Sequence, residues 1–175
     1  MKKMNKTLIV AALTAVMSVG AIAQTVDSTQ LQRKVRHELV MMPYLGVFDN
    51  LSYRIDNGVV TLMGEVVRPT TKSDAGRLVA RVEGVKGVVN NIEVLPLSPF
   101  DDRIRMAAYR AIYGYGPLQR YRLGTQPSIR IIVRNGNITL EGVVNNEMDK
   151  TLVNMRANQI PGVFSVSNDL QVVRS

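Results

Sequence analysis

The residues best suited to chemistry lie between Arg103 and Arg122, where basic, aromatic and sulfur-containing side chains alternate. The set consists of Arg103, Met106, Tyr109, Arg110, Tyr113, Tyr115, Arg120 and Arg122. Tyrosine rings favour the boundary between apolar and polar media, and guanidinium groups bind phosphate through paired hydrogen bonds. From residue 103 to residue 140 the chain has seven arginines and no carboxylate. The pattern suits the headgroup zone of an anionic membrane, and packing against the other half of the chain competes with that interpretation.

Catalytic residues are poorly represented in the chain. His37 is the only histidine, and its position in the helical pattern predicts a solvated side chain. Asp101 and Asp102 are adjacent, so their side chains diverge on a helix, where a capping role explains them better than acid–base chemistry. One histidine with scattered carboxylates makes no metal site, and the glycines lack phosphate-loop spacing. We expect no enzymatic activity, no cofactor and no bound metal.

The N-terminus predicts export. Residues 1–23 combine Lys2, Lys3 and Lys6 with an apolar stretch and a small-residue cleavage site that ends at Ala23. An uncleaved membrane anchor is the alternative. The chain has no cysteine, so it forms no disulfide and is not a lipoprotein. We therefore expect a periplasmic or secreted protein, a location that argues against a nucleic-acid partner.

The chain contains an internal repeat. A shift of 78 residues aligns positions 53–95 with positions 131–173 without a gap, and it pairs "NGVVTLMGEV" with "NGNITLEGVV". Identical residues occur at the turn, strand and helix-end positions, which indicates a duplicated domain. We expect one domain over residues 27–95 and a second over residues 99–173.

Each copy is predicted to be a small α+β unit of order αββαβ, with a mixed three-stranded sheet and two helices on one face. Asn57-Gly58 and Asn135-Gly136 are typical of a tight hairpin turn. Thr70 or Thr71 is expected to cap the helix that follows the first hairpin.

Gly64 and Gly142 lie inside the return strands, on the inward side. Either a helix backbone approaches the sheet closely there, or the strand bulges. The alternation of side chains continues in phase beyond each glycine, which favours the close approach.

The motifs "GVVTLMGEV" with "GVKGVVNNIEV", and "GNITLEGVV" with "GVFSVSNDLQV", resemble the BON family, the bacterial osmotic-stress and nodulation domain. The resemblance covers nearly all of the chain after the signal peptide. It implies a tandem pair of BON domains in an envelope protein associated with envelope integrity, osmotic stress and anionic phospholipid. The absent cysteine departs from those members of the family that carry a lipid anchor.

The two copies differ most in their first helix. In the second copy, the side opposite the predicted core stripe carries Met106, Tyr109, Arg110 and Tyr113, whereas the first copy carries basic residues and no aromatic there. This face could bind anionic phospholipid, pack against the other repeat, or bind another protein or a glycan. The leading hypothesis is a non-enzymatic envelope protein that binds phospholipid. The alternative is a periplasmic adaptor for another envelope protein, without direct lipid binding. The sequence leaves the oligomeric state open.

Overall fold

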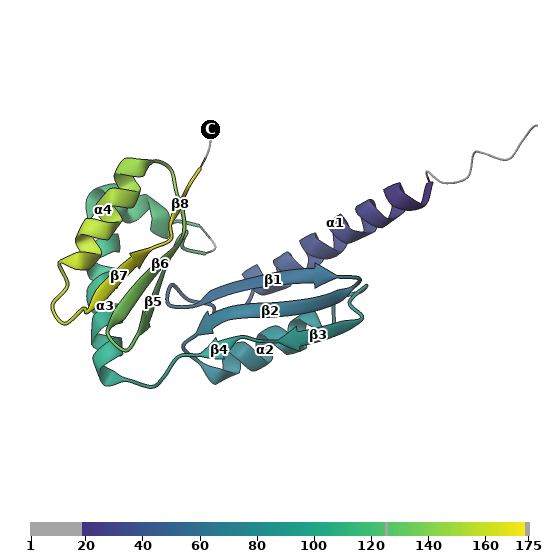
Figure 1. Ribbon diagram of the computed structural model, residues 1–175, viewed down its shortest axis with the longest axis horizontal. Coiled ribbons are helices and arrows are strands. Elements are labelled where there is room, and N and C mark those ends of the chain that lie inside the picture. The colour runs from purple at the N-terminus through teal and green to yellow at the C-terminus, as the bar shows by residue number, and fades with distance from the viewer. Residues whose placement is uncertain (1–18, 125, 174–175) are drawn as a thin grey trace, which may run out of the picture.

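The protein is described by a computed structural model over residues 19–124 and 126–173 (Figure 1). The first domain contains α1 (Val19–Val40), β1 (Asn50–Asp56), β2 (Val59–Val66), α2 (Pro69–Val79), β3 (Gly87–Asn90) and β4 (Glu93–Val94). The second contains α3 (Pro99–Tyr113), the 3-10 helix η1 (Gly116–Arg122), β5 (Ile129–Arg134), β6 (Asn137–Val144), α4 (Glu147–Asn158), β7 (Ser165–Asn168) and β8 (Gln171–Val172). The predicted signal peptide falls largely on residues 1–18, which lie outside the described residues.

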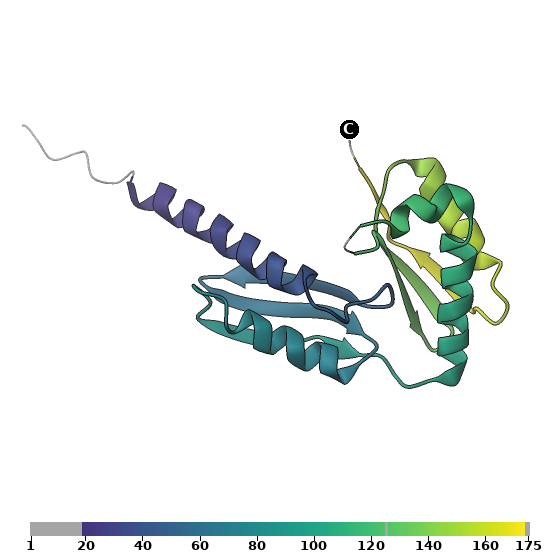
Figure 2. The same ribbon diagram turned by 180° about the vertical axis from the view of Figure 1, so that it is seen from behind.

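Both domains have the predicted α+β architecture. The strand pairs β1–β2 and β5–β6 are antiparallel, and the strands after the helical crossover run parallel to β2 and β6. In each domain two helices cover one face of the sheet (Figures 1 and 2). The last strand is broken in two, so that β4 and β8 pair separately with β2 and β6. The break shifts the alternation, since Val94 is exposed while Ile92 and Leu95 are buried.

The strand glycines allow a close approach, but the approaching chain is a strand. Gly64 and Gly142 have φ angles of +109° and +114°, which residues other than glycine rarely adopt. A Cβ atom would lie 2.1 Å from the carbonyl oxygen of Asn50 at Gly64, and 2.0 Å from that of Ser128 at Gly142. The pairing of β1 with β2 is one-to-one past Gly64, so no bulge forms. The expectation that these glycines seat a helix on the sheet is therefore wrong.

Two helix starts also differ from expectation. Pro69 is the first residue of α2 and Arg68 precedes it as N-cap, so Thr71 lies inside the first turn. Ser98 caps α3 in place of the adjacent aspartates. The buried Asp101 carboxylate instead accepts hydrogen bonds from the backbone N–H groups of Asn135 and Gly136, at 2.9 and 2.8 Å. Asp101 therefore ties α3 to the second hairpin turn.

Each domain has its own hydrophobic core, and the loop before β1 contributes to the core of the second domain. Val35, Leu62 and Val79 belong to the first core, which joins α1, β2 and α2. The second core joins α3, β5, β6 and α4, and it also includes Val47 of the first domain. Val47 lies in the loop of residues 41–49 between α1 and β1, which projects toward the second sheet (Figure 2). The first domain thus supplies part of the second domain's interior.

Candidate functional site

Part of the outer side of α3 is open to solvent. Ile104, Ala108 and Ile112 face the core, and Arg103, Met106 and Arg110 lie on the exposed side. Met106 is 44% exposed and Arg103 lies over the ring of Phe100, 5.7 Å from its centroid. A basic and apolar stripe therefore lies on the outside of the second helical layer.

Tyr113 is not part of that stripe. Its side chain is only 2% exposed, and its hydroxyl donates a hydrogen bond to the carbonyl oxygen of Ile129, at 2.5 Å. Burial raises the pKa of Tyr113 above the usual range, although the bond to Ile129 opposes that rise. The placement of Tyr113 on a lipid-facing surface is wrong, because the last turn of α3 packs against the start of β5 as well as against the sheet face.

Tyr109 packs against the first domain. Its ring lies edge-on to that of Phe48, with centroids 6.4 Å apart, and beside that of Tyr113, at 5.3 Å. Phe48 follows Val47 in the loop of residues 41–49. The face of α3 is therefore divided: Arg103, Met106 and Arg110 are exposed, whereas Tyr109 contacts the other repeat.

Most of the seven arginines are already engaged. Arg105 bonds Asp102 and the carbonyl oxygen of Val133, Arg120 pairs with Asp149, Arg130 donates to the carbonyl oxygen of Gly46, and Arg134 pairs with Glu93 and Glu65. Within the described residues, Arg103, Arg110 and Arg122 form no ion pair. Arg120 is thus part of a structural network. The guanidinium of Arg156 lies over the half-buried ring of Tyr115, 4.2 Å from the ring centroid.

The helical layer of the second domain also exposes apolar residues that the sequence analysis did not select. Met148 is 78% exposed, Met155 is 53% exposed and Phe164 is 74% exposed. The spacing of seven between Met148 and Met155 puts both on one face of α4, a signal that the sequence did contain. No large hydrophobic residue is exposed between residues 28 and 40 of α1 or on α2. The two helical layers therefore differ in character.

The domains meet where the loop of residues 41–49 reaches β5. The backbone N–H of Ile131 donates to the carbonyl oxygen of Val47 at 2.9 Å. Arg130 donates to the carbonyl oxygen of Gly46 at 2.9 Å, and Gln126 donates to that of Val40 at 3.0 Å. Burial lowers the pKa of Arg130, although the nearby Tyr113 and Asp49 favour its charged form.

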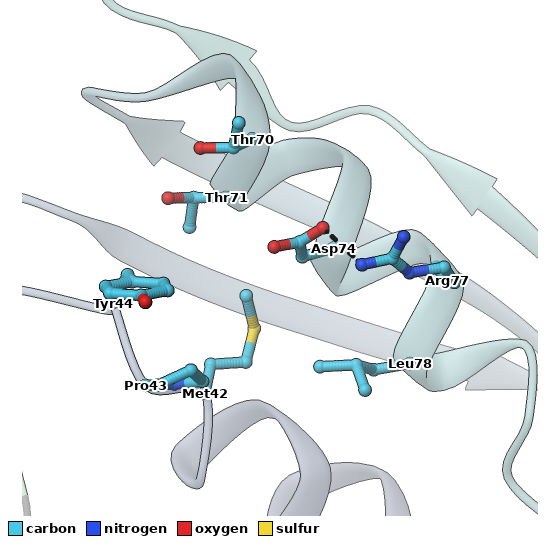
Figure 3. Close-up of a pocket in the computed structure, with 8 residues that line it drawn as sticks. All are labelled: Met42, Pro43, Tyr44, Thr70, Thr71, Asp74, Arg77 and Leu78. Carbon is cyan, nitrogen blue, oxygen red and sulfur yellow. Dashed lines mark hydrogen bonds and ion pairs between the residues drawn. The ribbon is translucent and has the colours of Figure 1, made fainter.

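A small pocket lies at the start of α2. Thr70, Thr71 and Asp74 of α2 face Met42 and Tyr44 of the loop across a pocket of about 180 Å³ (Figure 3). The hydroxyl of Thr71 is buried and has no hydrogen-bond partner within the described residues.

The repeat aligns Thr71 with Asp149 in the second domain. The Asp149 carboxylate accepts hydrogen bonds from Tyr121, Arg120 and Asn146. Although burial alone would raise the pKa of Asp149, the bonds from Tyr121 and Arg120 lower it below its usual range. The equivalent position is therefore fully bonded in one domain and unbonded in the other.

Catalytic groups do not converge in the described part of the chain. His37 is exposed, as predicted. No group of three or more potential metal ligands occurs among residues 19–124 and 126–173. In the same residues, no helix is long and apolar enough to cross a bilayer.

Comparison with known proteins places the chain in a family. The model of the BON domain matches residues 27–96 and again residues 118–174. The chain belongs to the BON domain family. The BON domain is non-catalytic, and its proteins are typically associated with the cell envelope. The second match begins after α3, so the helix that carries Arg103, Met106 and Arg110 lies outside it.

Solved structures add a distant likeness. The chain is similar to CdsD, described as a structural protein of the type III secretion system of Chlamydia trachomatis, with 14% identity and a TM-score of 0.34. That alignment covers 83% of this chain and 93% of the other. The C-terminal domain of CdsD gives 14% identity and a TM-score of 0.34, covering 82% and 98%. No curated protein matches the chain.

Proposed function

We propose that this BON-domain chain is a non-enzymatic, exported protein that supports the cell envelope by docking its second domain on anionic phospholipid. One observation carries the proposal: the outer side of α3 keeps Arg103, Met106 and Arg110 exposed, without carboxylate partners among the described residues. Exposed arginines attract an anionic membrane surface, and an exposed methionine side chain enters the boundary between headgroups and acyl chains.

The second helix of the same domain is also apolar on its exposed side. Met148 and Met155 on α4 and Phe164 in the following loop add exposed apolar area to the helical layer of the second domain. Arg122, which has no ion pair in the described chain, adds a third free cation to the domain. The revised set therefore drops Tyr109, Tyr113, Tyr115 and Arg120, which are engaged elsewhere, and gains residues of α4.

Co-sedimentation with vesicles at physiological salt tests the proposal. The chain is expected to bind vesicles that contain anionic phospholipid and to leave neutral phosphatidylcholine vesicles unbound. The triple variant Arg103→Ala/Met106→Ala/Arg110→Ala should lose at least about 2 kcal/mol of binding free energy, roughly thirty-fold in affinity, because two cations near the surface are removed.

The first domain offers a matched control. Arg33 and Arg81 are exposed on its helical layer, so Arg33→Ala/Arg81→Ala also removes two positive charges. Equal weakening by both variants would show that net charge, and not the α3 stripe, governs binding. Absence of binding to anionic vesicles would refute lipid docking and favour the adaptor function.

A further inference from the structure

The edge of each sheet is formed by the first strand of its domain, and the two edges can be compared residue by residue. Asp56 pairs with Val59 directly across the two-residue turn of the first hairpin. In an antiparallel pair, alternate residues direct both backbone groups at the partner strand or away from it. Leu51, Tyr53 and Ile55 therefore direct their N–H and C=O groups outward, at the free edge of β1.

The corresponding edge of β5 is bonded at three of its outward backbone groups. The carbonyl oxygen of Ile129 accepts from Tyr113, the N–H of Ile131 donates to Val47, and the carbonyl oxygen of Val133 accepts from Arg105. Val47 is 9% exposed, and Phe48 beside it contacts Tyr109. The turn formed by residues 46–49 of the first domain thus covers part of the edge of β5 beside α3.

The homologous slot between α1 and β1 is open. A groove of about 550 Å³ lies between the edge of β1 and the second domain, and its lining includes Arg36, Leu39, Leu51 and Tyr53 of the first domain and Arg130 and Val143 of the second. Within the described residues, the outward N–H and C=O groups of Leu51, Tyr53 and Ile55 have no hydrogen-bond partner. Unpaired backbone groups on a sheet edge can pair with another extended chain.

The lining of the groove combines apolar residues with two arginines. Leu39, Leu51 and Val143 offer apolar contacts. Arg36 takes the place that Tyr109 has in the second domain, since each follows a fully buried residue of its helix, Val35 and Ala108. Neither Arg36 nor Arg130 forms an ion pair with a carboxylate of the described chain. Charge complementarity therefore favours an acidic residue in the occupant.

We propose that this groove binds an extended segment of another envelope protein, which adds as a strand to β1 and presents an apolar residue, an aromatic residue and a carboxylate. Val47 and Phe48 of the turn at the edge of β5 are the precedent for the apolar and the aromatic residue, and Arg36, which has no ion pair in the described chain, favours the carboxylate. A second copy of the chain cannot offer that turn while it remains folded, because Val47 is buried in its own second domain. The proposal concerns the first domain and does not depend on lipid docking by the second.

The probe is a fluorescein-labelled peptide of residues 44–51, titrated with the purified full chain and followed by fluorescence anisotropy. We expect saturable binding, weakened at least tenfold by Arg36→Glu and changed less than about twofold by Arg33→Glu. Both variants make the same change of charge on α1, and Arg33 lies outside the groove lining. No saturable binding below about 1 mM, or equal effects of the two variants, would overturn the proposal.

Backbone methylation of the peptide tests strand addition itself. A strand added to β1 directs alternate residues of the peptide at the edge, so only one of two successive N–H groups bonds β1. Of two peptides, one N-methylated at Val47 and one at Phe48, one should lose binding and the other should keep it. Equal binding of the two peptides would overturn strand addition.

Hydrogen exchange gives an independent readout on the same protein. The amide of Tyr53 should exchange rapidly in the free chain and become protected by the peptide, while that of Ile131 is protected throughout. Protection of Tyr53 in the free chain would overturn the proposal. Dimerisation of the chain that Arg36→Glu abolishes would identify a second copy as the occupant and overturn the partner assignment.

Discussion

In the second domain the slot between α3 and β5 holds Val47 and Phe48, whereas in the first domain the slot between α1 and β1 is an open groove. The contact that fills the second slot is heterologous, because it joins a loop of one repeat to the strand edge of the other. Such a contact always leaves one slot unfilled in a two-repeat chain. The edge of β1 therefore stays open, because among the described residues no loop of the other repeat is hydrogen-bonded to it.

A second difference lies at the start of the second helix of each domain. Asp149 is held by Tyr121, Arg120 and Asn146, whereas Thr71 at the aligned position is buried with its hydroxyl unpaired. A buried carboxylate with several donors closes the helix start of α4 tightly. The equivalent place in the first domain is a small pocket. Domain 2 is therefore the more completely bonded unit at both positions.

Substitution of the strand glycines should destabilise both domains alike, and it should have the largest effect on the unfolding free energy. Gly64→Ala and Gly142→Ala each bring a Cβ to about 2 Å from a carbonyl oxygen at positive φ. Each should cost its domain about 3 kcal/mol or more of unfolding free energy, measured by urea denaturation. Gly116→Ala is the control, since no atom lies within 4 Å of its Cβ position. An unchanged urea midpoint in either glycine variant would contradict the shared role.

Substitutions at the aligned pair Thr71 and Asp149 should have opposite signs. Asp149→Ala leaves Tyr121 and Arg120 without their acceptor and should cost the second domain about 3 kcal/mol of unfolding free energy. Thr71→Val keeps the side-chain shape and removes an unpaired hydroxyl, so it should be neutral or stabilise the first domain by about 1 kcal/mol. Thermal unfolding of both variants measures the difference. Destabilisation by Thr71→Val of the same size as by Asp149→Ala would show that Thr71 has a partner in solution.

The loop contact predicts an effect that crosses the domain boundary. Val47→Ala removes buried side-chain atoms from the second core and should cost about 1.5–2 kcal/mol, although Val47 belongs to the first repeat. Hydrogen exchange should locate the loss of protection in β5, beginning at the amide of Ile131. Val89→Ala is a control of the same chemistry on an exposed site of the first sheet and should change stability by less than about 0.5 kcal/mol. Loss of protection confined to β1 would refute the cross-domain contact.

The fold was accessible from the sequence because each copy repeats its own local signals. Asn57-Gly58 and Asn135-Gly136 fix the hairpin turns, and alternation of apolar residues fixes which face of β2 and β6 is buried. The break between β3 and β4 was missed, since Ile92 and Leu95 are buried out of phase with a continuous strand. Local patterns therefore predict elements better than interruptions within them.

The binding surface was only partly accessible because its residues depend on non-local partners. A helical projection put Tyr113 on the outside of α3. In the structure β5 passes close to the end of α3, and the Tyr113 hydroxyl donates to the carbonyl oxygen of Ile129. The arginine-rich stretch showed its charges without the partners that neutralise them, such as Glu93 for Arg134. The contact of Val47 with β5 lies in a loop outside the aligned repeat, so no internal comparison could reveal it.

The smallest expected effect is a dependence of the unfolding free energy on pH, which Asp149 gives the second domain and Thr71 cannot give the first. Because the folded pKa of Asp149 is lowered, its contribution to stability is complete above the unfolded value near 3.9 and is lost as the pH falls through the lower folded value. One such group changes the unfolding free energy by at most about 1.4 kcal/mol per pH unit. We expect the stability difference between the unmodified chain and Asp149→Asn to shrink as urea denaturation is repeated from about pH 6 down to about pH 2.5.

Thr71 cannot titrate, so Thr71→Val provides the reference for that series: its stability difference from the unmodified chain should be independent of pH over the same range. Other carboxylates of the chain titrate in both members of each comparison and cancel in the difference. A pH-independent difference for Asp149→Asn would mean that Asp149 is not held in its charged form by Tyr121 and Arg120. In that case the bonded helix start could not be what distinguishes α4 from α2.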